Sequence, residues 1–310
     1  MNSFKDLIQY RKQFGTRLTV LKLILFILQW SKFFKGLFKK LNKYKHKLVR
    51  QRIQSIIPMD VYNQLDYASD KDTKVIWTFW YQGQENAPDI VKACFLSMKD
   101  KFEEYELRIL DKNTYKEYYQ PSSNILEKMD KGIISITHFS DLLRMHLLDT
   151  YGGMWIDATL YVCERPFQKS TFYTIKNVDG AIANISKGRW CTFMLGGNNP
   201  KLYRFVSLML EEYWKHFDGA VDYFIFDYII DIAYENIQEV RDYIDGVPNN
   251  NGNFFKLRDC LNTIVTNEQF EELLSCNQIH KLTYKMDFIN DSNSVYNRLI
   301  TKIGGSKYEM

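Results

Sequence analysis

Proline and cysteine are scarce in this chain, and it has no long uncharged apolar run. The 310 residues include 6 Pro and 15 Gly, which excludes a collagen-like or linker-dominated protein. The 5 Cys form no CxxC pair, so we expect neither a zinc module nor a disulfide scaffold, and a reducing compartment is the default. The longest apolar run, residues 23–30, is shorter than the roughly 20 residues of a membrane-spanning helix. This run also begins late in the sequence, and no small-residue cleavage site follows it, so a signal peptide is not expected.

Apolar residues make up 45% of the chain and charged residues 25%, a globular composition that excludes wholesale disorder. Aromatic residues are abundant at 15%. We expect most of them in the core, although such a surplus also suits surfaces that stack on sugars or bases. The length fits about two average domains or one large α/β domain.

Charge is distributed unevenly along the chain. Residues 1–57 hold 14 Lys and Arg against one acid, Asp6, whereas the remainder holds 27 basic and 36 acidic residues. The sequence therefore predicts a basic arm over residues 1–57 and a body over residues 58–310. The arm's apolar residues, Trp30 among them, suit a lipid boundary and its Lys residues suit anionic headgroups, so we expect an amphipathic helix in a membrane interface. Two alternatives are packing on the acidic body and nucleic-acid binding, which the dense apolar content disfavours.

Strand-like and helix-like segments alternate through the body. The expected strands are residues 75–80, 105–110, 154–162, 171–175 and 180–185, and the main expected helices are residues 90–99, 138–151, 200–217 and 221–235. Thr137 is the expected N-cap of the second of these helices, and Gly152 and Gly153 end it. This alternation predicts an α/β fold with a mostly parallel sheet, in which ligands bind at the carboxyl ends of the strands.

Residues 140–159, S-D-L-L-R-M-H-L-L-D-T-Y-G-G-M-W-I-D-A-T, carry the most chemistry. Asp141 and Arg144 share a helix face and suit sugar hydroxyls and phosphate, although taken alone they are more typical of a surface pair. Asp157 and Thr159 follow an apolar strand and lie on the same side of it. Their oxygens suit a divalent cation bridging a diphosphate.

This segment resembles the DXD-containing glycosyltransferases, which include capsular polysaccharide synthesis transferases, initiating mannosyltransferases and large glucosylating toxins. The matching residues are Ser140, Asp141, Leu143, Arg144, Tyr151, Gly152, Gly153, Trp155 and Asp157. Residues 76–83 (I-W-T-F-W-Y-Q-G) and 279–285 (I-H-K-L-T-Y-K) resemble two further motifs of that family, so that the resemblance covers about residues 73–286. It implies a GT-A fold with one Rossmann-like domain, a nucleotide-sugar donor, and retention of anomeric configuration.

The resemblance also implies roles for individual residues. Trp80 would stack on the base of the donor. Asp141 would bind ribose or sugar hydroxyls, and Arg144 would orient the transferred sugar. The remaining donor-binding residues would be Gln82, Gly83, Ser140, Trp155, Thr159 and Lys281.

A divalent cation, Mn²⁺ or Mg²⁺, is the cofactor that the resemblance implies. Asp157 matches the first Asp of the DXD motif, but Thr159 stands where the second Asp, usually the direct metal ligand, is expected. His280 is a candidate replacement ligand, although a single His is more typical of a structural position. Lys281 could instead neutralise the diphosphate leaving group.

Retention is compatible with two routes: attack by an enzyme carboxylate, or entry of the acceptor on the leaving-group side. We favour the second route, because no motif fixes a second carboxylate. Asp227 is the best candidate for an acid that faces sugar or acceptor, with Asp222 and Asp231 as alternatives. A polar position on an otherwise apolar helix explains Asp227 equally well.

These features together predict a hexosyltransferase on the cytoplasmic face of the cell membrane. It would move a hexose from a UDP-sugar to a growing, lipid-linked capsular or surface polysaccharide, and no nucleic-acid partner is expected. One rival is a non-catalytic protein that binds nucleotide sugar or glycan, which the Thr at position 159 favours. A metal-dependent phosphohydrolase is disfavoured, because no second acidic cluster could hold two ions.

Overall fold

A computed structural model describes residues 4–30, 33–68, 71, 73–166, 172–178 and 185–304. Its contacts divide the chain into two compact units. The helical unit comprises Met1–Ser69, Pro121–His146 and Pro200–Arg241, and the sheet unit comprises Asp70–Gln120, Leu147–Asn199 and Asp242–Met310. Residues 1–57 belong to the helical unit, together with two later segments of the chain. The sequence analysis instead divides the chain after residue 57, and that division stays a prediction. Among the described residues, none of the helices has the length and apolar content needed to cross a bilayer.

The sheet unit is built on a five-stranded sheet in the order β2-β1-β3-β6-β5. The strands are β1 (Val75–Phe79), β2 (Glu106–Leu110), β3 (Met154–Ile156), β5 (Tyr173–Thr174) and β6 (Met194–Gly196). β1 pairs in parallel with β2 and β3, and β6 is antiparallel to both β3 and β5. Four of the five strands therefore run in the same direction, which confirms the predicted α/β class with a mostly parallel central sheet.

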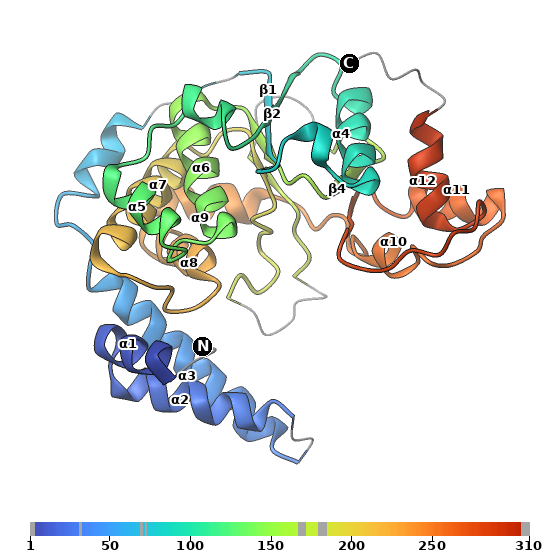
Figure 1. The fold of residues 1–310 in the computed structure, drawn as a ribbon. Helices are drawn as coiled ribbons and strands as arrows, with labels where there is room; N and C mark the ends of the chain where they lie inside the picture. Colours follow the sequence, from blue (N-terminus) through green and yellow to red (C-terminus); the bar gives the residue numbers. More distant parts are fainter. Residues whose placement is uncertain are drawn as a thin grey trace. The chain divides into compact units, whose positions relative to one another are not determined.

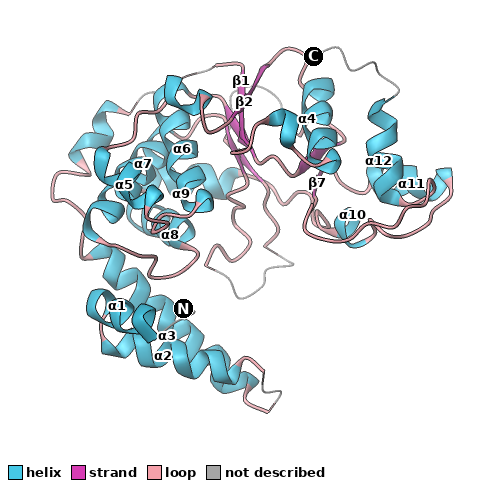
Figure 2. Cartoon of the chain, viewed as in Figure 1, coloured by secondary structure: helices cyan, strands magenta, loops and turns pink. Residues whose placement is uncertain are grey.

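Helices and a second small sheet complete this unit. Its other elements are η2 (Gln84–Asn86), α4 (Asp89–Lys101), η3 (Thr114–Glu117), β4 (Leu160–Val162), α10 (Lys256–Asp259), α11 (Asn267–Ser275), β7 (Ile279–Lys281) and α12 (Val295–Gly304). α4 packs on β4 and α12. The apolar face of α4 and the sheet form one hydrophobic core, which includes Ile76, Met98 and Ile156. Figures 1 and 2 trace these elements, and Figure 2 shows that helices predominate over strands.

The expected single strand over residues 154–162 is wrong. The chain leaves the central sheet after Ile156, turns with a hydrogen bond from Leu160 N to Asp157 O (2.9 Å), and re-enters as β4 in the two-stranded sheet with β7. The turn places Asp157 and Thr159 in a loop. The alternation of side chains between the two faces of a strand therefore no longer requires them to lie on the same side. Most of the expected strand over residues 180–185 lies outside the described residues, and β6 was not predicted.

The helical unit consists of helices from three parts of the chain. These are α1 (Phe4–Phe14), α2 (Thr16–Leu28), α3 (Lys35–Gln54), η1 (Asn63–Tyr67), α5 (Ser123–Asp130), α7 (Pro200–His216) and α8 (Ile225–Asn236). α6 (Ile136–Tyr151) and α9 (Gln238–Gly246) contribute residues to both units. α2 packs against α1 and α3, and α3 packs against α8 (Figure 1).

The predicted N-cap of α6 is wrong. The helix begins at Ile136, so Thr137 lies within it. Ser135, one residue before the helix, accepts a hydrogen bond from the backbone N of His138 at 3.2 Å. This is the contact that an N-cap hydroxyl makes with an otherwise unpaired N–H of the first turn.

Ion pairs join the basic arm to acids of the helical unit. Lys45 lies 2.8 Å from Asp222, and Arg50 lies 3.1 Å from Asp231. Both Asp side chains are largely buried, so the paired cation offsets the free energy of desolvating each carboxylate. One face of α3 therefore packs on acidic residues. Packing on the acidic body was one of the three interpretations of the arm. Asp222 and Asp231, the alternatives to Asp227 in the sequence analysis, are the carboxylates of these two ion pairs.

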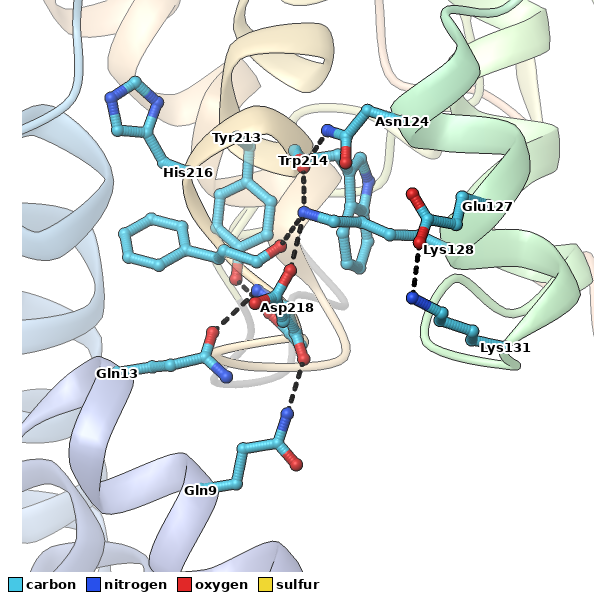
Figure 3. A network of polar contacts seen from close by, with 12 residues as sticks. Gln9, Gln13, Asn124, Glu127, Lys128, Lys131, Tyr213, Trp214, His216 and Asp218 are labelled. Atoms are coloured by element: carbon cyan, nitrogen blue, oxygen red, sulfur yellow. Dashed lines mark hydrogen bonds and ion pairs between the residues drawn. The ribbon is translucent and has the colours of Figure 1, made fainter.

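A second polar network ties α1 to the end of α7 (Figure 3). Lys128 of α5 lies 2.8 Å from the Asp218 carboxylate and donates to the carbonyl oxygen of Phe217 at 3.0 Å. Asp218 also bonds through its backbone: its N–H donates to Gln13 Oε1 at 2.7 Å, and its carbonyl accepts from Gln9 at 3.3 Å. Because Lys128 is buried, losing Asp218 would leave a cation poorly compensated.

We expect His46 of α3 to make the stability of the helical unit depend on pH. Asn42 donates to its Nε2 at 3.0 Å, which leaves Nδ1 to donate to the Tyr228 hydroxyl. Burial, together with the neighbouring Lys45, lowers the pKa of His46 from 6.5 to about 4, although Asp222 and Asp231 oppose this shift. The unfolded chain therefore binds this proton more readily, so stability is full above pH 6.5 and falls as the pH drops towards 4.

Between pH 7 and pH 5 the wild type should lose about 1 kcal/mol more unfolding free energy than His46→Gln, a figure discounted for the partly exposed ring. Urea denaturation at the two pH values measures the difference. His216→Gln, which removes an exposed His of the same unit, is the control and should behave like the wild type. An identical pH dependence in wild type and His46→Gln would contradict the assignment.

Candidate functional site

Trp80 directly follows β1 at the carboxyl edge of the central sheet. Its ring is half-buried and meets the exposed Tyr284 ring edge-on, with centroids 5.1 Å apart. Its indole N–H is buried and has no hydrogen-bond partner among the described residues. The chain then turns tightly, with Gly83 N donating to Trp80 O at 2.9 Å and Gly83 at a φ of +91°. The neighbouring Gln82 is exposed.

Two glycines carry the chain from α6 into β3. Gly153 has a φ of +83°, and a Cβ there would lie 2.4 Å from the carbonyl oxygen of Val75. Gly152 has a φ of +70°, and its carbonyl accepts a hydrogen bond from the buried Trp77 indole at 2.9 Å. Only glycine accommodates this path without strain, and the path sets the register of β3 against β1.

Asp157 follows β3 and is held from two sides. The Trp155 indole N–H donates to Asp157 Oδ1 at 2.7 Å, and Lys281 Nζ lies 2.9 Å from Oδ2. Trp155 itself is 1% exposed, so this predicted donor-binding residue is a core residue that positions Asp157. Lys281 also lies over the Phe193 ring, 4.9 Å from its centroid. The pair is only partly exposed, so its attraction is less screened than that of a surface pair.

Lys281 and His280 are neighbours on β7 and face opposite sides, as successive strand residues do. Lys281 reaches Asp157, whereas the ring of His280 is fully buried and hydrogen-bonded to the carbonyl oxygen of Leu274 at 3.0 Å. Burial lowers the pKa of His280. The structure therefore does not bring His280 to Asp157.

The residues around Asp157 fit a divalent cation poorly. Both carboxylate oxygens already contact a donor, and position 159 supplies a hydroxyl, with the Thr159 carbonyl accepting from Leu282 N at 2.8 Å. Among the residues that the structure describes, no group of three or more His, Cys, Asp or Glu is arranged to hold a metal. The donor set is thus one carboxylate next to an ammonium, which is not what Mn²⁺ or Mg²⁺ selects. The predicted cation stays a prediction.

Asp141, Arg144 and Ser140 lie on the part of α6 that belongs to the helical unit. Arg144 is 4% exposed and lies 3.6 Å from Asp141 Oδ1, while its Nη2 donates to Ser140 Oγ at 3.4 Å. The guanidinium also lies 5.2 Å from the centroid of the Phe226 ring. This burial identifies the Asp141–Arg144 pair as more than a surface pair.

Asp227 lies half-buried on α8, also in the helical unit. Trp80, Trp155, Asp157, Thr159 and Lys281 belong to the sheet unit, where side-chain contacts join Trp155, Asp157 and Lys281. The roles that the resemblance implies for Asp141, Arg144 and Asp227 stay predictions.

Sequence reasoning missed two aromatic residues at this edge. Tyr284 packs against Trp80, and Phe193 accepts a hydrogen bond at its carbonyl oxygen from Asp157 N at 2.9 Å. Phe193 immediately precedes β6, a strand too short to recognise in the sequence. Tyr284 lies within the quoted motif of residues 279–285, three residues after Lys281, and that membership was the available signal.

Known proteins resemble this chain over much of its length. A family model described as "Capsular polysaccharide synthesis protein" matches residues 29–299. The O-glycosyltransferase PaGT of Phomopsis amygdali is 31% identical over 154 residues, a match that covers 42% of this chain and 36% of that protein. The chain thus aligns with about a third of this relative's length. Among solved structures, the PaToxG glycosyltransferase is 12% identical with a TM-score of 0.37, covering 84% of this chain and 98% of that one.

Gly153 provides a direct test of how β3 is positioned. Gly153→Ala should lower the free energy of unfolding by about 3 kcal/mol, because it combines a strained φ with a clash against the Val75 carbonyl. Gly246→Ala is the matched control, since a Cβ at that position meets nothing within 4 Å. Urea denaturation measures both, and equal stabilities of the two variants would contradict the assigned turn.

Proposed function

The chain belongs to the capsular polysaccharide synthesis family, and from this premise we propose that it is a retaining glycosyltransferase that moves a hexose from a UDP-sugar. The acceptor is a growing, lipid-linked capsular or surface polysaccharide. The observation that carries the proposal is the Asp157–Lys281 pair, which lies one strand away from Trp80 at the carboxyl edge of the sheet. Ligands of α/β proteins bind at this edge.

The uracil ring of the donor stacks at Trp80. An aromatic ring at the end of a strand offers the flat apolar surface on which a base stacks. The Trp80 indole N–H, buried and without a partner among the described residues, also favours a polar ligand here, because an unsatisfied buried donor costs about 1–3 kcal/mol. The Tyr284 ring meets the Trp80 ring edge-on, with centroids 5.1 Å apart.

Lys281 stabilises the leaving diphosphate. In the reaction the acceptor hydroxyl oxygen bonds to C1 of the sugar as the bond from C1 to the diphosphate oxygen breaks. The electron pair goes to the diphosphate, which takes the hydroxyl proton when the acceptor enters on the leaving-group side. A positioned cation lowers the barrier by matching this developing charge.

Asp157 and Trp155 position that cation. Asp157 fixes Lys281 Nζ at 2.9 Å, and the Trp155 indole fixes the carboxylate in turn. Because the residues at this edge fit a divalent cation poorly, we assign the charge stabilisation to Lys281. The Thr at position 159 also supports a second candidate function, a protein that binds nucleotide sugar without turnover. UDP binding without donor cleavage would favour that candidate.

Removing the Lys281 charge tests the proposal. Lys281→Met should lower UDP-sugar turnover by about 100- to 1000-fold, the usual effect of losing one preorganised donor to a developing charge. Lys99→Met, which removes an exposed Lys of α4, should leave turnover unchanged. Donor cleavage is measured as released UDP over a panel of UDP-sugars, with EDTA and with Mn²⁺.

We expect similar wild-type rates in EDTA and in Mn²⁺. Wild-type turnover that EDTA abolishes and Mn²⁺ restores would contradict the role given to Lys281. Full activity of Lys281→Met would contradict it as well.

We also propose that the end of the α2–α3 hairpin holds the enzyme on the inner face of the cell membrane, beside its lipid-linked acceptor. One side of α2 is buried through Leu18, Leu21 and Leu25. The other side of α2, the described residues between α2 and α3, and the first turn of α3 expose large apolar side chains: Val20, Leu23, Ile24, Phe26, Ile27, Trp30, Phe33, Phe34 and Leu37. Trp30 and Phe33 are 81% and 96% exposed, which is unusual for such residues.

Charge favours a bilayer as the occupant of this surface. The exposed Lys residues of α3 are Lys35, Lys39, Lys40, Lys43 and Lys47. Neither α2 nor α3 contains an Asp or a Glu. Apolar side chains flanked by cations suit the boundary of an anionic leaflet, where each cation near the surface adds about 1 kcal/mol. The apolar end of a hairpin replaces the single in-plane helix expected from the sequence.

A double variant tests this membrane contact. Phe33→Ser/Phe34→Ser should weaken binding to vesicles of phosphatidylethanolamine and phosphatidylglycerol at least about tenfold, through lost apolar burial. Met59→Ser, at an equally exposed apolar position of the helical unit, should bind like the wild type. Vesicle co-sedimentation measures both, and undiminished binding of the double variant would contradict the contact.

A further inference from the structure

Three residues follow one another along the carboxyl edge of the sheet. Trp80 follows β1, and Asp157 follows β3. Phe193 precedes β6, which is antiparallel to β3, with Ile156 paired to Met194. Because β3 lies between β1 and β6, Asp157 lies between Trp80 and Phe193, and the outer two are about 10 Å apart at two strand spacings. A donor whose base lies at Trp80 and whose diphosphate lies at Lys281 therefore directs its sugar towards Phe193.

Phe193 begins an aromatic row that continues to the surface. We define the row as Phe193, Phe254 and Phe255. Ring centroids are 5.5 Å apart between Phe193 and Phe254, and 4.3 Å apart between Phe254 and Phe255. Lys281 lies over the inner end of the row, and the Arg258 guanidinium lies 4.1 Å from the Phe255 centroid at its outer end.

Backbone hydrogen bonds hold the row in place. Asp157 N donates to Phe193 O at 2.9 Å, and Lys281 N donates to Phe254 O at 2.8 Å. The same two residues that form the central ion pair thus also bind the two inner residues of the row through their main chains. The row is preorganised relative to the reacting centre, which reduces the entropy lost when a ligand binds.

Burial along the row decreases outward. Phe193 and Phe254 are half-buried and pack against the core of the sheet unit. Phe255 is 37% exposed, and its side chain is not part of that core. The partly exposed Phe255 ring with the Arg258 guanidinium over it, and further charges at Lys281 and Asp157, offers apolar surface together with hydrogen-bonding groups.

That combination suits a pyranose ring. The C–H face of a sugar packs on an aromatic ring, while its hydroxyls need charged or polar partners at the rim. We propose that Phe193, Phe254 and Phe255 form the subsite for the saccharide acceptor, with Phe255 and Arg258 binding the sugar farthest from the transferred hexose. This inference rests on the proposed function, since it takes the donor to lie between Trp80 and Lys281.

Phe255→Ala tests the subsite at its most exposed ring. The probes are the methyl glycosides of glucose, galactose, mannose and N-acetylglucosamine, added with UDP to the full-length protein. Saturation-transfer NMR gives the dissociation constant of each glycoside, and calorimetry gives that of UDP. In the variant we expect glycoside affinity to fall about five- to tenfold, the effect of losing one stacked ring, with UDP affinity unchanged within about twofold.

Two further variants sharpen this test. Phe255→Trp keeps a ring and should bind glycosides like the wild type. Ile289→Ala, at the same 37% exposure in the same unit, is the matched control and should also bind like the wild type.

Three outcomes would overturn the subsite. They are binding of none of the four glycosides to the wild type, unchanged glycoside affinity in Phe255→Ala, and a parallel loss of UDP affinity, which would move the row to the donor side. Failure of the wild type to bind UDP or any UDP-sugar would instead overturn the proposed function. The two failures are therefore distinguishable.

Discussion

The ion pair between Asp157 and Lys281 is the contact on which the proposed site in the sheet unit depends. It joins the loop after β3 to β7, two segments separated by 124 residues. Trp155 fixes the carboxylate from inside the core, and the same two residues bind Phe193 and Phe254 through their backbones. The side chains of these two residues thus fix the position of a cation, and their main chains bind the neighbouring aromatic residues. The partial burial of the pair makes that attraction effective.

The sequence predicted β1 and β2 better than it predicted β6, the strand that follows Phe193. β1 is recognisable because it is a continuous run of buried or half-buried residues, and β2 because all its residues after the exposed Glu106 are buried or half-buried. β6 is only three residues long and ends in Gly196, so neither its alternation nor its composition identifies it. Its antiparallel direction, which brings Phe193 beside Asp157, depends on long-range pairing that no local pattern encodes.

His280 and Lys281 illustrate a constraint that the sequence did contain. Adjacent residues of one strand face opposite sides, so the two could not both serve one site. The structure places Lys281 at Asp157 and buries His280 against α11. The arm is the opposite case. Its composition indicated an apolar and basic segment, but the pairing of Lys45 and Arg50 with Asp222 and Asp231 depends on how α3 packs on α8. That packing leaves one end of the hairpin exposed.

The most direct test of the account is a crystal structure of the full-length chain with UDP bound. We predict the uracil ring stacked on Trp80 and a diphosphate oxygen within hydrogen-bonding distance of Lys281 Nζ, on the same edge as Asp157. A nucleotide bound elsewhere on the sheet unit, or a diphosphate held away from Lys281, would contradict the central claim.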